Sequence, residues 1–193
     1  MTRKDSLTKL NQEIKNCKKC LLWKLRKNTV SGKGPVNARI MILGQSPGAK
    51  EDKIGKPFIG RAGKLLDELL KIGKIEKEKV FITSVLKCLP QPPINRKPKK
   101  EEIEACLPYL KKQIEIINPP KIILLGEVIF KVFFPKEKLK DSRGKWVKKD
   151  GKFYFPTYHP AAGLRFPKTK KILEKDFLKL EDILLKNSPR DFL

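Results

Sequence analysis

The chain has 193 residues, with 45 lysines and arginines against 21 aspartates and glutamates, which gives a formal net charge of +24 at pH 7. Such an excess indicates a polyanionic partner, nucleic acid above all, and excludes the balanced mixture of charges that is typical of many thermophilic surfaces. The length predicts a single domain, 1–193, with a hydrophobic core of ordinary size.

No transmembrane segment or secretion signal is visible. The chain contains no run of about 18 apolar residues, and residues 1–16 lack the apolar stretch of a signal peptide. We therefore expect a soluble, cytoplasmic protein without a membrane partner. Thiols stay reduced in that compartment, so the four cysteines are not expected to form disulfides.

Apolar periodicity predicts helices that alternate with strands. Ser6 is the expected N-cap of a first helix that ends near Cys17. Pro108 should kink the helix around it or mark where that helix begins. The predicted strands cover residues 39–44, 80–86, 121–126 and 152–158, and the further helices cover 60–73, 101–118, 127–134 and 170–186.

This alternation predicts an α/β fold, a three-layer α/β/α sandwich around a central four-stranded parallel sheet, because parallel strands need helical crossovers that cover both faces. In such sheets ligands bind beyond the carboxyl ends of the strands. A proline-rich basic loop at 89–100 precedes one helix, and we expect its Arg96, Lys97, Lys99 and Lys100 to contact phosphates.

The four cysteines form a pattern typical of a metal centre: Cys17 and Cys20 are separated by two residues, and Cys88 and Cys106 follow. An iron-sulfur cluster and a zinc ion both accept four thiolates. The lack of a second C-x-x-C pair argues against a zinc ribbon, but the residues alone leave cluster, zinc and ordinary buried cysteines open. A bound metal group would join the N-terminal helix to the loop after the second strand.

Residues 41–63 begin in an apolar strand and continue into a stretch rich in glycine and proline. The range contains five glycines and two prolines, so a ligand can closely approach the main chain there. Neither the phosphate-binding G-x-x-x-x-G-K-[ST] nor the dinucleotide-binding G-x-G-x-x-G motif is present. Phe58 lies in the segment that returns towards this strand end, and His159, the only histidine, follows the fourth predicted strand. Each could instead be purely structural.

Together these motifs resemble the family 4 uracil-DNA glycosylases, the iron-sulfur members of the uracil-DNA glycosylase superfamily. The resemblance runs from about Cys17 to Arg165. It is carried by GQSPG at 44–48, PF-x-G-x-AG at 57–63, VFITSVLKC at 80–88, NR-x-P-x-x-EEI-x-AC at 95–106 and TYHPAAGLR at 157–165.

The resemblance implies roles for individual residues. Phe58 matches the ring that stacks on uracil, His159 the residue that stabilises charge on uracil O2, and Glu51 the carboxylate expected to position the attacking water. Residues 161–165 match the loop that enters the duplex, where we expect Leu164 to fill the vacated space and Arg165 to contact phosphate. The other implied residues are Gly44, Gln45 and Ser46 for base binding and Cys17, Cys20, Cys88 and Cys106 for a structural [4Fe-4S] cluster, with zinc as the alternative.

Three positions depart from the family pattern. Gln45 replaces a usual acidic residue, Ser46 a usual glycine or alanine, and Ser84 the asparagine that reads the uracil edge. A serine hydroxyl is shorter than an asparagine side chain and rotates freely, whereas the amide offers a donor and an acceptor in fixed geometry. Base choice at Ser84 is therefore open.

The function implied is a monofunctional, monomeric DNA repair enzyme that flips uracil out of single- or double-stranded DNA and hydrolyses its N-glycosidic bond, leaving an abasic site. One alternative is the same scaffold acting on another deaminated base, such as hypoxanthine. The other is a non-catalytic iron-sulfur protein that binds nucleic acid.

Overall fold

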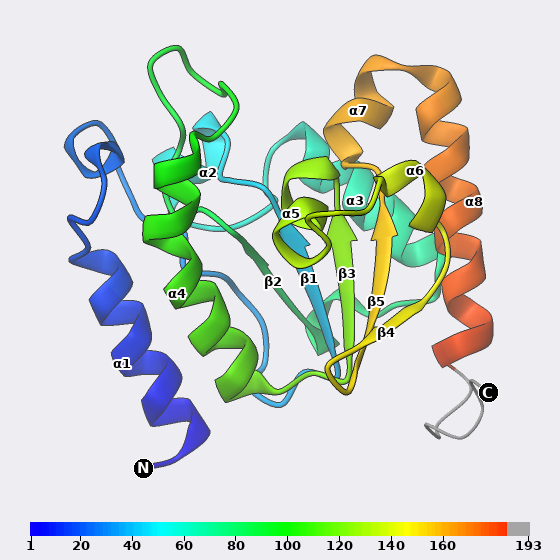
Figure 1. Ribbon diagram of the computed structural model, residues 1–193, viewed down its shortest axis with the longest axis horizontal. Helices are drawn as coiled ribbons and strands as arrows, with labels where there is room; N and C mark the ends of the chain where they lie inside the picture. Colours follow the sequence, from blue (N-terminus) through cyan, green and yellow to red (C-terminus); the bar gives the residue numbers. More distant parts are fainter. Residues whose placement is uncertain (185–193) are drawn as a thin grey trace.

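The computed structural model of the chain describes residues 1–184, and side chains as far as Leu180. Its centre is a five-stranded sheet in the order β2-β1-β3-β5-β4 (Figure 1). The predicted strands are present as β1 (Ile40–Gly44), β2 (Val80–Ser84), β3 (Lys121–Leu125) and β5 (Lys152–Thr157), and they pair in parallel.

The prediction of four strands was wrong by one. β4 (Val147–Lys149) pairs antiparallel with β5 at the edge of the sheet. Asp150 and Gly151 both have positive φ angles, 48° and 72°, and connect the two strands. An Asp-Gly pair is typical of such tight hairpins, so a sequence signal was present, but the strand is only three residues long.

Helices cover both faces of the sheet, which confirms the layered α/β architecture (Figure 1). One core contains α1, α4 and α5 against side chains such as Met41 and Leu43, whereas α3 and α8 pack on the other face against Ile40 and Ile42. The helices are α1 (Arg3–Lys15), α2 (Ala49–Ile54), α3 (Arg61–Ile72), α4 (Lys100–Ile117), α5 (Glu127–Phe133), α6 (Leu139–Ser142), α7 (Pro160–Arg165) and α8 (Pro167–Leu184).

Three helix predictions need correction. The N-cap of α1 is Thr2 rather than Ser6: Thr2 Oγ1 accepts from Asp5 N at 3.1 Å, and Asp5 Oδ2 accepts from Thr2 N at 2.9 Å. Helix α4 continues through Pro108 as one element. Helix α8 starts three residues earlier than predicted, and residues 185–186 of its predicted end lie outside the described residues.

Within residues 1–184, no helix combines the length and apolar character needed to cross a membrane.

Candidate active site and metal centre

The predicted base-binding residues come together at the carboxyl edge of the sheet. Gly44 ends β1 and pairs in register with Ser84, which ends β2. His159 follows β5 by two residues and is the N-cap of α7. The parallel strand order brings these three chain segments to one edge, as expected for a parallel α/β sheet.

Phe58 and His159 lie face to face in this site, with ring centroids 5.8 Å apart and ring planes inclined by 28°. Phe58 is buried and has φ +50°, a backbone conformation that residues other than glycine rarely adopt. A Cβ atom at Gly44 would lie 2.8 Å from Phe58 Cζ, so only glycine lets the ring lie on the end of β1. Gly63 similarly makes room for the Phe58 main chain.

The Glu51 carboxylate is fixed beside these rings by the main chain. Its Oε1 accepts hydrogen bonds from Ile59 N at 2.9 Å and from Gly60 N at 2.7 Å. A Cβ atom at Gly48 would lie 2.8 Å from Oε2, so the glycine leaves that oxygen its space. Four glycines of residues 41–63, Gly44, Gly48, Gly60 and Gly63, therefore fit closely around Phe58 and Glu51.

His159 is held as a neutral hydrogen-bond donor. Burial lowers its pKa to about 4, although the nearby Glu51 charge acts in the opposite direction. Its Nδ1 accepts a hydrogen bond from Ala161 N at 3.1 Å, so the proton of the neutral ring is on Nε2. Gly126 has φ +98°, and a Cβ atom at this position would lie 3.1 Å from the Cβ atom of His159. The site thus offers an uncharged N–H.

The turn after β1 is fixed to the chain that follows β2. Val85 N donates to Gly44 O and Leu86 N donates to Gln45 O, both at 3.1 Å. Ser84 is buried beside this turn, and its Oγ lies 3.4 Å from the position that a Cβ atom on Gly44 would take. Gln45 and Ser46 are half-buried.

Asp52, the neighbour of Glu51, has a structural environment. It is buried, and its carboxylate accepts hydrogen bonds from Lys27 N at 3.1 Å and from Asn28 N at 3.4 Å. Asn28 returns a hydrogen bond to the Asp52 carbonyl oxygen. Asp52 therefore anchors the N-terminal segment to α2.

The predicted duplex-entering loop is a short helix. Leu164 and Arg165 lie in the last turn of α7, and both are exposed, Leu164 by 49%. Leu164 therefore projects an apolar side chain from the same edge of the sheet as His159.

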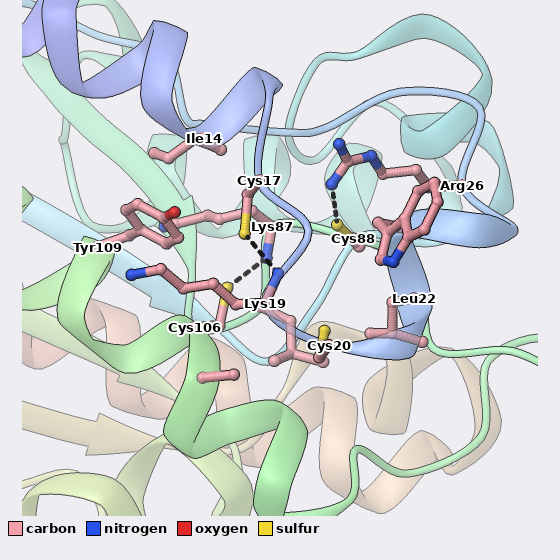
Figure 2. A pocket seen from close by; sticks show the side chains of 13 residues that line it. Ile14, Cys17, Lys19, Cys20, Leu22, Arg26, Lys87, Cys88, Cys106 and Tyr109 are labelled. Atoms are coloured by element: carbon pink, nitrogen blue, oxygen red, sulfur yellow. Dashed lines mark hydrogen bonds between the residues drawn. The ribbon is translucent and has the colours of Figure 1, made fainter.

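The four cysteines line one cavity between α1, the 3₁₀ helix Leu21–Lys24, the end of β2 and α4. Figure 2 shows the four sulfur atoms around a common space. Arg26 Nη1 donates to Cys88 Sγ at 3.4 Å, and Lys87 N donates to Cys106 Sγ at 3.3 Å. The predicted convergence of three separate chain segments is thus present.

Burial raises the pKa of Cys106 to about 11 and also raises the pKa values of Cys88 and Cys20. Thiols of this kind ionise when a metal binds and displaces their protons. Among the described residues, no three cysteine, histidine, aspartate or glutamate side chains are arranged to hold a single metal ion. Four converging thiols are a ligand set that both an iron-sulfur cluster and a zinc ion accept.

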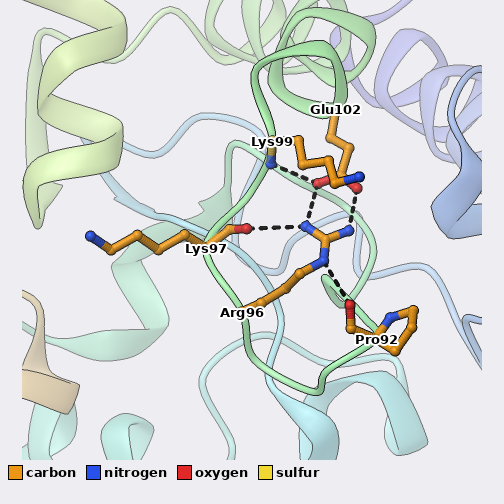
Figure 3. Close-up of polar contacts among 5 residues, drawn as sticks. All are labelled: Pro92, Arg96, Lys97, Lys99 and Glu102. Atoms are coloured by element: carbon orange, nitrogen blue, oxygen red, sulfur yellow. Dashed lines mark hydrogen bonds and ion pairs between the residues drawn. The ribbon is translucent and has the colours of Figure 1, made fainter.

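Arg96 was expected to contact phosphate, but its guanidinium is engaged within the proline-rich loop. Its guanidinium binds both carboxylate oxygens of Glu102, at 2.9 and 2.5 Å, and donates to the carbonyl oxygens of Pro92 and Lys97 (Figure 3). The pKa of Glu102 is lowered, and the main cause is this hydrogen bond from Arg96. Arg96 therefore fixes the loop, whereas Lys97, Lys99 and Lys100 remain exposed.

Sequence reasoning missed three polar groups around these sites. Arg26 faces Cys88, and Lys87 is buried beneath Ser84. Arg143 binds the buried carboxylate of Asp176, which also accepts from Thr157 Oγ1 at 2.7 Å below the β5 end. Only Lys87 left a sequence signal, as a lysine directly after a buried apolar strand.

A family model, the uracil DNA glycosylase superfamily, matches residues 31–181. The chain belongs to this superfamily. It is 47% identical to the type-4 uracil-DNA glycosylase of Sulfurisphaera tokodaii, over 94% of this chain and 86% of that protein. The corresponding protein of Saccharolobus solfataricus is also 47% identical, over 93% of this chain and 87% of its own length.

A more distant glycosylase supports the same assignment. The type-4 uracil-DNA glycosylase of Archaeoglobus fulgidus is 39% identical, over 97% of this chain and 98% of that protein. The sequence similarity to this relative therefore covers both the cysteine cavity and the strand-end site.

Proposed function

We propose that this protein is a uracil-DNA glycosylase of DNA repair, which flips uracil out of DNA and hydrolyses its N-glycosidic bond. The observation that carries this is the convergence of Phe58, His159 and Glu51 at the strand ends, in a chain whose type-4 relatives match nearly its full length. These relatives favour uracil over the hypoxanthine alternative.

The flipped base would stack on Phe58, with its edge towards Ser84 and the Gly44–Gln45 main chain. When the glycosidic bond breaks, negative charge develops on the departing uracil. The neutral His159 ring would donate its Nε2 proton in a hydrogen bond to uracil O2 and stabilise that charge. A ring that is already neutral does so without first losing a proton.

Glu51 would hold the attacking water. Its Oε1 is engaged by two main-chain N–H groups, which leaves Oε2 as the oxygen for the water. The water oxygen bonds to the sugar carbon as that carbon gains positive character, and the water passes a proton to Glu51 Oε2. The bond from the sugar carbon to the base breaks, and the base leaves as an anion with the bonding electrons.

DNA would approach the carboxyl edge of the sheet. The +24 net charge attracts the phosphates, Leu164 fills the space that the base leaves, and Arg165 contacts a phosphate. Flipping costs a few kcal/mol and is cheapest at a mismatch such as uracil opposite guanine.

The product would be an intact strand with an abasic site. Strand cleavage by such enzymes requires an amine that forms a Schiff base, typically a lysine with a lowered pKa. Burial lowers the pKa of Lys87 to about 8, but Lys87 is 1% exposed and uses its ammonium in three hydrogen bonds. Burial also lowers the pKa values of Lys121 and Lys152, but these lysines begin β3 and β5 at the opposite edge of the sheet. This placement favours a monofunctional enzyme.

Cys17, Cys20, Cys88 and Cys106 would hold a [4Fe-4S] cluster, with zinc as the alternative. The four converging thiols and the type-4 relatives that match nearly the full chain support the cluster. Bound there, it would supply cross-links between the N-terminal segment, β2 and α4. We further propose that the chain forms one domain and acts as a monomer, which fits a single sheet with a core on each face.

The test is incubation of the purified protein with a duplex that contains one uracil, followed by analysis of strands and free base. The expected result is free uracil and full-length strands that break only after alkali. Breakage without alkali would overturn the monofunctional mechanism, and release of no base would overturn the proposed function.

A further inference from the structure

Lys87 is a fully buried lysine, only 1% exposed, and the mechanism does not use it. Its ammonium donates to Ser84 O at 2.6 Å and to Thr83 Oγ1 and Gln113 Oε1, both at 2.7 Å. All three protons of the ammonium are therefore matched by neutral oxygens. A buried charge is costly unless it is so paired, which indicates that this geometry is tightly defined.

The bond from Lys87 Nζ to Ser84 O closes the chain on itself directly after β2. The two residues enclosed by this closure are Val85 and Leu86, whose N–H groups donate to Gly44 O and Gln45 O. Lys87 thus fixes the short segment that in turn fixes the base-binding turn. Ser84, whose carbonyl oxygen is the acceptor, is the residue expected at the base edge.

The main chain of Lys87 faces the other site. Its N–H donates to Cys106 Sγ at 3.3 Å, and its carbonyl oxygen accepts from Val30 N at 2.8 Å. Cys88 is the next residue. One residue therefore has its backbone in the wall of the cysteine cavity and its side chain under the end of β2 (Figure 2).

We propose that Lys87 is a positioning residue, which holds Ser84 and the Gly44–Gln45 turn in register for the base and ties that register to the cysteine centre. This rests on the proposed function, in that the turn is taken to bind uracil. Displacement of such a turn by about 1 Å is enough to slow catalysis about a hundredfold.

The test is Lys87→Met, which keeps the apolar stem and removes the ammonium. We expect faster hydrogen exchange at the Val85 and Leu86 amides, unchanged exchange in β3 and β5, and retained iron content. On uracil-containing DNA, kcat should fall about tenfold while KM stays within about twofold. Lys152→Met is the matched control, because that lysine is hydrogen-bonded to Asn118 and Pro119 at the opposite edge of the sheet.

Exchange and kcat equal to those of the unchanged protein would overturn the proposal, as would exchange that is faster in all strands alike. If Lys87→Met does not fold, Thr83→Val decides, because it removes one ammonium partner in a nearly isosteric way. It should raise exchange at the same two amides, and an unaltered pattern would overturn the proposal. If the unchanged protein releases no uracil, the proposed function fails, yet the exchange experiment still tests the positioning.

Discussion

The two sites of this protein differ in what surrounds them. The cysteine cavity is assembled from segments far apart in sequence and is walled by apolar residues such as Ile14, Leu22 and Leu86. The strand-end site is formed by glycine-rich main chain, with one carboxylate and one imidazole held by backbone N–H groups. The first is suited to a permanently bound group, the second to a substrate that enters and leaves.

This contrast predicts the largest effect at the cysteines. Cys88→Ala should lower the melting temperature by about 10 °C or more and abolish iron binding, because the proposed metal group would cross-link the N-terminal segment, the chain after β2 and α4. Thermal unfolding with iron analysis measures both. Ser142→Ala, a buried polar change away from the cavity, should cost far less, and a stable, fully active Cys88→Ala would contradict the structural role.

At the strand-end site a change should affect rate rather than stability. His159→Ala should lower kcat about 10²- to 10³-fold, because it removes the donor to the developing charge. Binding to undamaged DNA should stay within about twofold. Tyr158→Phe, which keeps the neighbouring ring, serves as the control. An equal loss of binding and rate would assign His159 a structural role instead.

The pH dependence sharpens the same contrast. Because burial lowers the pKa of His159 to about 4, kcat should show no inflection near pH 6.5, the usual histidine pKa. The unfolded chain takes up this proton first, so the free energy of unfolding should fall as pH decreases from about 6.5 towards 4. Since His159 is the only histidine, nitrogen NMR can follow its ring without ambiguity, and protonation near pH 6.5 would refute the assignment.

The smallest effect concerns the proline-rich loop. Replacing Lys97 and Lys99 by alanine should reduce the slope of log affinity against log salt by about one to two units, because two exposed charges are lost. Arg96→Ala should leave that slope nearly unchanged and destabilise the loop, since Arg96 is engaged with Glu102. Binding titrations across salt concentrations separate the two, and a slope reduced most by Arg96→Ala would reverse this assignment.

The parallel sheet was predictable because its strands are short apolar runs buried on both faces, as the residues of β1 and β2 show. β4 was missed because it has only three residues, none of them is buried, and two of them are lysines. The alternative that the main helix begins at Pro108 was wrong, because this proline lies inside the 18-residue helix α4 and removes only one N–H donor from it.

For the sites, the count of four cysteines and the C-x-x-C pair indicated a metal centre, and the resemblance favoured it over ordinary buried cysteines. The partners of Arg26, Lys87 and Arg96 were not predictable, because each depends on how distant or irregular segments meet in space. The proximity of Phe58 to His159 came from the resemblance and from topology, which places both at the carboxyl edge of the sheet. The catalytic roles of these residues stay predictions.

The most direct test is single-turnover base release from matched duplexes that contain uracil, hypoxanthine or xanthine at one position. The account predicts that uracil is released fastest by a wide margin, despite the serine at position 84. Preferential release of hypoxanthine, or release of no base from any of the three, would contradict it.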